Sequence, residues 1–124
     1  MVTLTLYRQA GERYYAFELE GHAGYAEPGE DIVCAALTAL GTTLIGAVED
    51  LLEVDCEYVA GPGLISLEVP GVGSYSEAME EKIDLLFRAF GLGCRQVYES
   101  LEDGSSWIRI EEMELSEEDY YVED

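Results

Sequence analysis

His22 and Cys34 are the residues of this sequence whose types and spacing best suit chemistry. His22 is the only histidine, and Cys34, the first of three cysteines, follows after eleven intervening residues. Arg13–Glu20 (RYYAFELE) alternates loosely, as a strand does, and an apolar run with helical spacing begins at Ile32. We therefore predict His22 at the end of a strand and Cys34 at the start of a helix, joined by a loop rich in Gly and Pro.

This arrangement suits a thiol nucleophile. A free thiol is mostly protonated at neutral pH, and a helix N-terminus and a nearby imidazole both raise the fraction of reactive thiolate. The unpaired N–H groups of the first helical turn, including that of Cys34, are also expected to stabilise the oxyanion formed when a peptide carbonyl is attacked. Asp31 has two alternative roles, capping the helix or orienting His22, and the sequence leaves both open.

Each residue also has a plainer interpretation. A cysteine between Val33 and Ala35 is more often a small core residue, and a histidine after a strand is usually a hydrogen-bonded loop residue. A resemblance favours chemistry over packing here. Residues 21–23 (GHA) and 29–40 (GEDIVCAALTAL) are similar, in order, spacing and flanking residues, to the signature of the ribosomal-processing cysteine protease family, Prp.

The resemblance implies specific roles. In that family the histidine of the first motif and the cysteine of the second form a catalytic dyad, which assigns these roles to His22 and Cys34. Thr38 stands where serine is expected in many members; it keeps a hydroxyl one turn beyond Cys34 and, with Asp31, is assigned a supporting role. The resemblance further implies a homodimer that removes a short hydrophobic N-terminal extension, with paired phenylalanines before the cut, from the bacterial large-subunit ribosomal protein number twenty-seven.

The charge is consistent with a basic partner. Twenty-seven acidic and six basic residues give a formal net charge of −21, which opposes binding to nucleic acid or to an anionic membrane surface. The cysteines are odd in number and widely spread, and no basic n-region with an apolar core is found near residue 1, so we expect reduced thiols in a cytoplasmic protein. The uncharged stretch 32–48 is short for a membrane span and has acidic flanks, which favours a buried helix.

Two other functions were weighed against a peptidase. The acidic surface alone would suit a non-catalytic interaction module that binds a basic ribosomal protein. A metal site built from His22 and the cysteines is disfavoured, because there is one histidine and no Cys-x-x-Cys pair. We expect neither a metal nor a cofactor.

The elements that must position these residues follow from periodicity. We predict an α+β fold with a two-layer, mostly antiparallel sheet in the order ββαββαβ and two helices on one face. Residues 1–113 form the single domain and residues 114–124 an acidic, flexible tail. The predicted strands are 2–7, 13–20, 54–59, 64–69 and 107–110. The first helix runs from 32 to 51, and the second begins near Ser74 or Ser76, where residues 74–77 match a capping box, and continues through Gly91 and Gly93 to 101.

Glycines are predicted to matter at two further places. Gly41 and Gly46, inside the first helix, are expected to allow close approach to another element or subunit. The loop Gly24–Gly29 is a candidate lid over the dyad, although a connection without function is an equal alternative.

Overall fold

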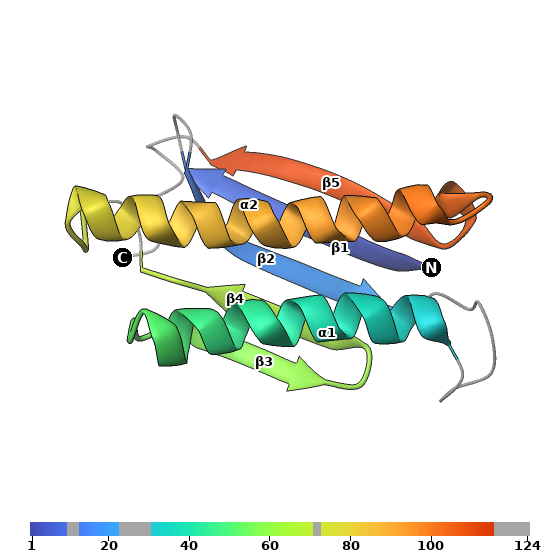
Figure 1. The fold of residues 1–124 in the computed structure, drawn as a ribbon, viewed down its shortest axis with the longest axis horizontal. Helices are drawn as coiled ribbons and strands as arrows, with labels where there is room; N and C mark the ends of the chain where they lie inside the picture. Colours follow the sequence, from blue (N-terminus) through green and yellow to red (C-terminus); the bar gives the residue numbers. More distant parts are fainter. Residues whose placement is uncertain (10–12, 23–30, 71–72, 116–124) are drawn as a thin grey trace.

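The computed structural model describes residues 1–9, 13–22, 31–70 and 73–115, and it contains a five-stranded sheet with two helices packed on one face (Figure 1). The elements, in chain order, are β1 (Val2–Gln9), β2 (Tyr14–Gly21), α1 (Ile32–Gly46), the π-helical turn η1 (Ala47–Leu51), β3 (Glu57–Gly61), β4 (Leu64–Glu68), α2 (Glu77–Ser100), the 3₁₀ turn η2 (Gly104–Ser106) and β5 (Ile108–Leu115). The predicted α+β class and the ββαββαβ order are confirmed.

The strand order across the sheet is β3-β4-β2-β1-β5. Three of the four neighbouring pairs are antiparallel, and only β1 and β5 run parallel. A parallel pair needs a long crossover, and here that connection contains α2, which lies across the sheet before β5 returns beside β1. The face opposite the helices is left uncovered by any described element (Figure 1).

Alternation in the strands builds the core. Val2, Leu4 and Leu6 of β1 are buried, and Leu4 and Leu6 lie opposite Leu19 and Phe17 of β2. The ring of Phe17 packs on Phe90 of α2, with 4.5 Å between the centroids. The period of two predicted for the first strand therefore supplies one face of the core, because every second side chain points at the helices.

The first helix packs on the sheet by one side only. Together α1 and η1 span Ile32–Leu51, which is long and apolar enough to cross a membrane by length and composition, and a third of that window is buried. The buried side includes Val33, Leu37, Leu44 and Val48. The exposed side carries no charge from Ile32 to Thr43; its members are Ile32, Ala35, Thr38, Ala39, Thr42 and Thr43. The prediction of a buried helix therefore holds for one face.

Several predicted boundaries were wrong. The third strand begins at Glu57 rather than Val54, because Glu53 adopts a left-handed backbone (φ 56°) after η1 and the strand pairs only where it meets β4. Cys56 therefore lies just before the strand. Gly61 and Leu64 pair with each other, so the β3–β4 hairpin has a turn of two residues, instead of the four between the predicted strands 54–59 and 64–69.

Two further boundaries concern α2 and β5. Ser76 caps α2 by accepting a bond from the Met79 N–H at 3.2 Å, so of the two predicted starts Ser76 is confirmed and Ser74 is not the cap. The final strand runs from Ile108 to Leu115, because β1 offers a paired partner along that whole length. Residues 114 and 115, assigned to the tail, thus belong to the sheet, and residues 116–124 lie outside the described residues.

The helix glycines fall into two groups. A Cβ on Gly41 would lie 3.2 Å from Leu19 Cδ1, which confirms a close approach to the sheet, whereas a Cβ on Gly46 would meet nothing within 4 Å. The helix α2 runs unbroken through Gly91 and Gly93, as predicted, and these glycines lie against Leu6 and Leu40.

Candidate active site

His22 follows directly on the end of β2. The strand ends at Gly21, whose φ of 101° is a backbone conformation that favours glycine and turns the chain out of the sheet. The Gly21 N–H donates to the Gly63 carbonyl at 2.9 Å, which ties this end of β2 to the β3–β4 hairpin. His22 is exposed to solvent. The predicted position of the histidine at a strand end is confirmed.

Cys34 lies in the first turn of α1 and is half-buried. Asp31 is the N-cap residue, and its Oδ1 accepts a bond from the Cys34 N–H at 2.9 Å. Asp31 therefore caps the helix, which is the first of the two roles left open for it. The same bond corrects an expectation, because the Cys34 N–H is occupied by the cap and is not a free donor for an oxyanion.

The β3–β4 hairpin borders both the histidine and the cysteine. A hollow of about 30 Å³ between α1 and this hairpin is lined by Cys34, Thr38, Gly61 and Gly63, with Leu37, Leu64 and other apolar neighbours. His22 lies against the same hairpin, since a Cβ built on Gly63 would be 3.3 Å from His22 Nε2. Gly63 is therefore a neighbour that Cys34 and His22 share.

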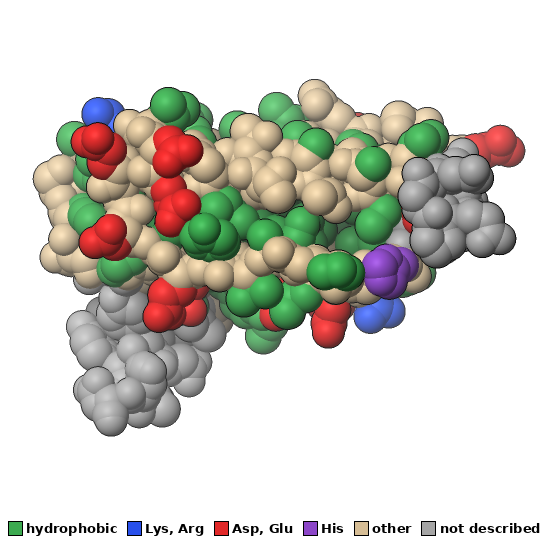
Figure 2. All heavy atoms as spheres, turned by 90° about the horizontal axis from the view of Figure 1, so that it is seen from below, with side chains coloured by type: hydrophobic (Ala, Val, Ile, Leu, Met, Phe, Trp, Pro, Cys, Tyr) green, Lys and Arg blue, Asp and Glu red, His purple; other side chains and the backbone are tan. Residues whose placement is uncertain are grey.

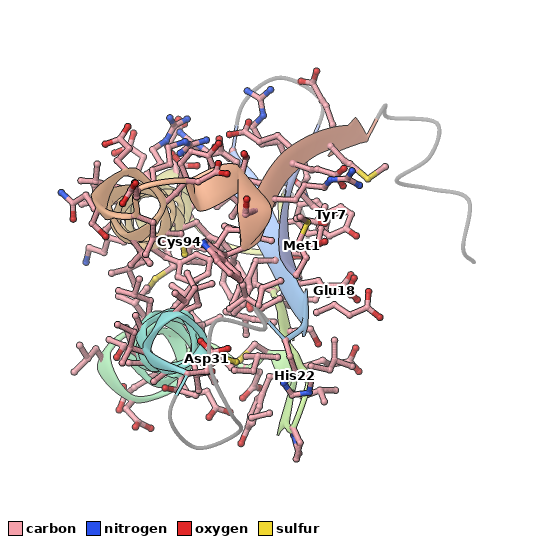
Figure 3. All side chains as sticks on the ribbon, turned by 90° about the vertical axis from the view of Figure 1, so that its right-hand side faces the viewer. Met1, Tyr7, Glu18, His22, Asp31 and Cys94 are labelled. Atoms are coloured by element: carbon pink, nitrogen blue, oxygen red, sulfur yellow. The ribbon has the colours of Figure 1, made fainter. Side chains whose placement is uncertain are left out.

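The cluster occupies one end of the molecule. Figure 3 views this end, where β2 ends and α1 begins, and both His22 and Asp31 lie there. Thr38 is exposed, and it lines the hollow one turn beyond Cys34. The predicted lid, Gly24–Gly29, lies outside the described residues.

The other two thiols have different surroundings. Cys94 is fully buried, and this burial raises the pKa of its thiol to about 12. Burial, with the nearby carboxylates of Glu49 and Asp55, also raises the pKa of Cys56. Both thiols therefore hold their protons more tightly than an ordinary cysteine, which leaves Cys34 as the candidate nucleophile.

No metal centre is formed by the described part of the chain. Within residues 1–9, 13–22, 31–70 and 73–115, no group of three His, Cys, Asp or Glu side chains lies close enough to hold an ion. The described residues thus give the alternative of a metal site no support.

An α+β fold that sets a cysteine in the first turn of a helix and a histidine on a neighbouring strand end is compatible with the thiol hydrolase class. The family model for cysteine protease Prp matches residues 1–105, so this chain belongs to the Prp family of cysteine proteases. The resemblance of the two motifs is thereby confirmed at the level of the family.

Individual relatives agree with this assignment. The ribosomal processing cysteine protease Prp of Bacillus subtilis is 40% identical over 48 residues, which is 39% of this chain and 43% of the relative, so the match spans less than half of that protein. The structure of SMU.848 from Streptococcus mutans is 30% identical, with a TM-score of 0.69 over 93% of this chain and 96% of that one.

A further structure shares the fold. It is the essential ribosomal processing protease Prp of S. aureus, determined with a covalently linked product peptide; it is 18% identical, with a TM-score of 0.75 over 90% of this chain and 99% of that one. At this identity the likeness supports the fold alone.

Sequence reasoning missed the hairpin as part of the site. The segment 60–63 was interpreted only as a turn, although its Pro-Gly pair is a signal for a fixed backbone conformation. Because Gly63 lies about forty residues from His22 in the chain, only the pairing of β2 with β4 makes them neighbours.

Proposed function

We propose that this protein is a cysteine endopeptidase in which Cys34 is the nucleophile and His22 the acid–base residue, and that its substrate is the bacterial large-subunit ribosomal protein number twenty-seven. The observation that carries the proposal is that Gly63 lies against His22 and lines the same small hollow as Cys34, in a chain of the Prp family. The ribosomal processing activity named for the B. subtilis relative supports the choice of substrate.

The mechanism follows from the positions of the two side chains. His22 accepts the proton from the Cys34 Sγ, and the resulting thiolate attacks the scissile carbonyl carbon to form a tetrahedral intermediate. When the carbon–nitrogen bond breaks, the imidazolium returns the proton to the leaving amine. Water, deprotonated by His22, then hydrolyses the acyl-enzyme and releases Cys34. The positive end of the α1 dipole stabilises the thiolate throughout.

The uncovered face of the sheet supports a basic substrate. Glu18, Glu20, Glu57 and Glu68 project from this face, and none of them forms an ion pair with another described residue. Figure 3 shows Glu18 and Tyr7 pointing away from the helices. A shallow hollow of about 390 Å³ on this face is lined by Tyr7 and three of these carboxylates. Such a surface attracts cationic chains and repels nucleic acid and anionic lipid.

The uncharged, exposed side of α1 supports a homodimer. Two chains that each carry a charge of −21 repel one another, so a stable contact needs a face without charge. The exposed side of α1 is uncharged over four turns, and exposed Leu51 and Tyr58 lie nearby on η1 and β3. Figure 2 shows apolar side chains gathered between these elements. We place the subunit contact there, in a cytoplasmic protein.

The dimer contact can be tested by introducing a charge. Light scattering after size exclusion is expected to give twice the mass of one chain for the wild type and for Ala89→Glu, on the exposed side of α2. Ala39→Glu, on the exposed side of α1, is expected to give a single chain. A wild-type monomer, or an Ala39→Glu dimer, contradicts this placement.

The peptidase proposal is tested by mass spectrometry of the basic ribosomal protein with its native N-terminal extension. The wild type and Cys56→Ala are expected to make a single cut near paired aromatic residues, and Cys34→Ala and His22→Ala to make none. Cys56 is a matched control because it is also a half-buried thiol, but lies outside the cluster.

The runner-up function, a non-catalytic acidic module that binds a basic ribosomal protein, is favoured by the four carboxylates on the uncovered sheet face. It predicts that the substrate is bound but left uncut by the folded wild type, and that alkylation does not prefer Cys34 over Cys56.

A further inference from the structure

Gly63 is the residue on which the imidazole of His22 rests. A Cβ built on Gly63 would lie 3.3 Å from Nε2, 3.9 Å from Cε1 and 4.0 Å from Cδ2 of His22. The contact is therefore made by the outer edge of the ring, which includes the nitrogen farthest from the backbone. A real Cβ is rarely found as close as 3.3 Å, so a side chain at residue 63 would displace the ring or the hairpin.

The backbone of Gly63 is also specialised. Its φ of 78° lies in the left-handed region that glycine adopts readily and most other residues do not. In this conformation its carbonyl accepts the bond from the Gly21 N–H at 2.9 Å, one residue before His22. The Gly63 backbone thus binds the segment that carries His22, and the absence of a side chain on Gly63 leaves space for the imidazole ring.

The hairpin also borders the thiol. Cys34 and Gly63 line the same small hollow, together with Thr38 of α1. Gly63 therefore lies against the imidazole and also lines the hollow that Cys34 lines, so a displacement of the ring at Gly63 changes its position relative to the thiol. Because proton transfer requires hydrogen-bond reach, a displacement of a few tenths of an ångström or more has a direct effect on the rate.

We propose that Gly63 is a positioning residue for His22: its left-handed backbone and missing side chain hold the imidazole within reach of Cys34. The inference rests on the proposed function, since it assigns Gly63 a part in the same dyad. It makes no claim that Gly63 contacts the substrate.

The test compares the same substitution at two glycines. Gly63→Asn keeps the left-handed backbone accessible, because Asn tolerates this region better than other side chains, yet it places a Cβ against His22. Gly73→Asn is the matched control: Gly73 has a φ of 91°, and a Cβ there would meet no atom of the described residues within 4 Å. The two variants experience the same kind of backbone strain, but only the first has a side chain against the imidazole.

The expected kinetic result is a split between kcat and KM. Gly63→Asn should lower kcat at least about tenfold and leave KM within about twofold, because the substrate pocket is kept while the proton path is altered. Gly73→Asn should match the wild type in both. If Gly63→Asn folds and cleaves at the wild-type rate while His22→Ala is inactive, the positioning role is overturned and the proposed function stands.

A second readout does not depend on cleavage. The rate at which iodoacetamide alkylates Cys34 at neutral pH is expected to fall about fivefold or more in Gly63→Asn, and to be unchanged in Gly73→Asn. His22 is the only histidine, so its ring signals in the NMR spectrum are unambiguous and should shift in the first variant only. If Gly63→Asn shows these changes but the wild type cuts no substrate, the positioning role is retained and the peptidase function is overturned. If alkylation and the ring signals are the same in Gly63→Asn as in the wild type, the positioning role is overturned.

Discussion

At the scale of single residues, the site depends on short contacts made by residues without catalytic chemistry of their own. Asp31 caps α1 and bonds the amide of the proposed nucleophile, and Gly63 supports the proposed base. The oxyanion donor expected at the Cys34 N–H is already used by the cap. An oxyanion must therefore be bound by groups other than the Cys34 N–H.

Asp31 offers the first prediction. Asp31→Ala should lower the free energy of unfolding by about 1 kcal/mol, because the cap is lost. Asp31→Ser should keep most of this stability and a kcat within about threefold of the wild type, since serine also caps helices. Urea unfolding and peptidase kinetics on both variants check this. If kcat falls a hundredfold or more in an Asp31→Ser variant that is as stable as the wild type, Asp31 is instead a third catalytic residue beside Cys34 and His22.

At the scale of the elements, glycines in α1 show how closely a helix approaches the sheet. Gly41 and Gly46 sit in the same apolar helix and invite the same interpretation from sequence. The structure separates them, because Leu19, Ile65 and Phe17 surround the site of a Cβ on Gly41, and a Cβ on Gly46 would have open space.

This difference predicts opposite effects on stability. Gly46→Ala should raise the free energy of unfolding by about 0.5–1 kcal/mol, because alanine is the better helix former and meets no neighbour. Gly41→Ala should lower it by about 1–3 kcal/mol, because overpacking against buried Leu19 outweighs the same gain. Urea unfolding at one protein concentration measures both. Equal effects at the two positions would show that α1 does not pack on the sheet as described.

The ion pairs of β5 give a prediction about pH. Burial tends to raise the pKa of Glu112, but bonds from Tyr14 and Arg95 and the charges of Arg8 and Arg95 outweigh it, so the pKa is lowered. A carboxyl with a lowered pKa stabilises the fold above its unfolded pKa, and this stabilisation is lost as the pH falls through the folded one. Its Oε2 lies 2.8 Å from Arg95 Nη2, which links β5 to α2.

Glu112→Gln is therefore expected to lose about 0.5–1 kcal/mol of stability at pH 7 and almost none near about pH 3. The quantity to measure is the difference in free energy of unfolding between variant and wild type, because the other acidic residues titrate equally in both. Glu111→Gln is the control, since its pair with Arg109 is longer, at 3.7 Å, and more exposed. A difference that persists at low pH contradicts the electrostatic explanation.

At the scale of the whole molecule, charge is distributed unevenly. The uncovered sheet face carries carboxylates without ion pairs among the described residues, whereas the exposed side of α1 from Ile32 to Thr43 carries no charge. We assign the first surface to the basic substrate and the second to a second copy of the chain. The two surfaces lie on different sides of the molecule, so both can be occupied together.

Substrate capture should consequently depend on salt. Between about 50 and 300 mM NaCl, kcat/KM for the full-length basic protein should fall about tenfold or more, because salt screens attraction across several ångströms. A short uncharged peptide that spans the cut should show little change. Initial rates on both substrates check this. If kcat/KM falls equally with salt for the full-length protein and for the short peptide, the salt effect arises at the dyad and the acidic surface has no role in capture.

The sequence by itself determined the order of elements, the class of fold and the family. Period-two alternation in Val2–Tyr7 and helical spacing from Ile32 are local properties, and the two motifs lie close to each other in the chain, so all of them can be interpreted without knowing the fold. The positions of His22 at a strand end and Cys34 in a first helical turn followed from the same local signals.

Only the tertiary structure decided which distant residues complete the site. Gly63 reaches His22 because β4 pairs with β2, the third strand starts at Glu57 because pairing with β4 begins there, and β5 extends to Leu115 because β1 runs beside it. That Asp31 caps α1 was shown by the geometry of one hydrogen bond. These outcomes depend on register and approach between segments far apart in sequence, and periodicity within a single segment carries no information about them.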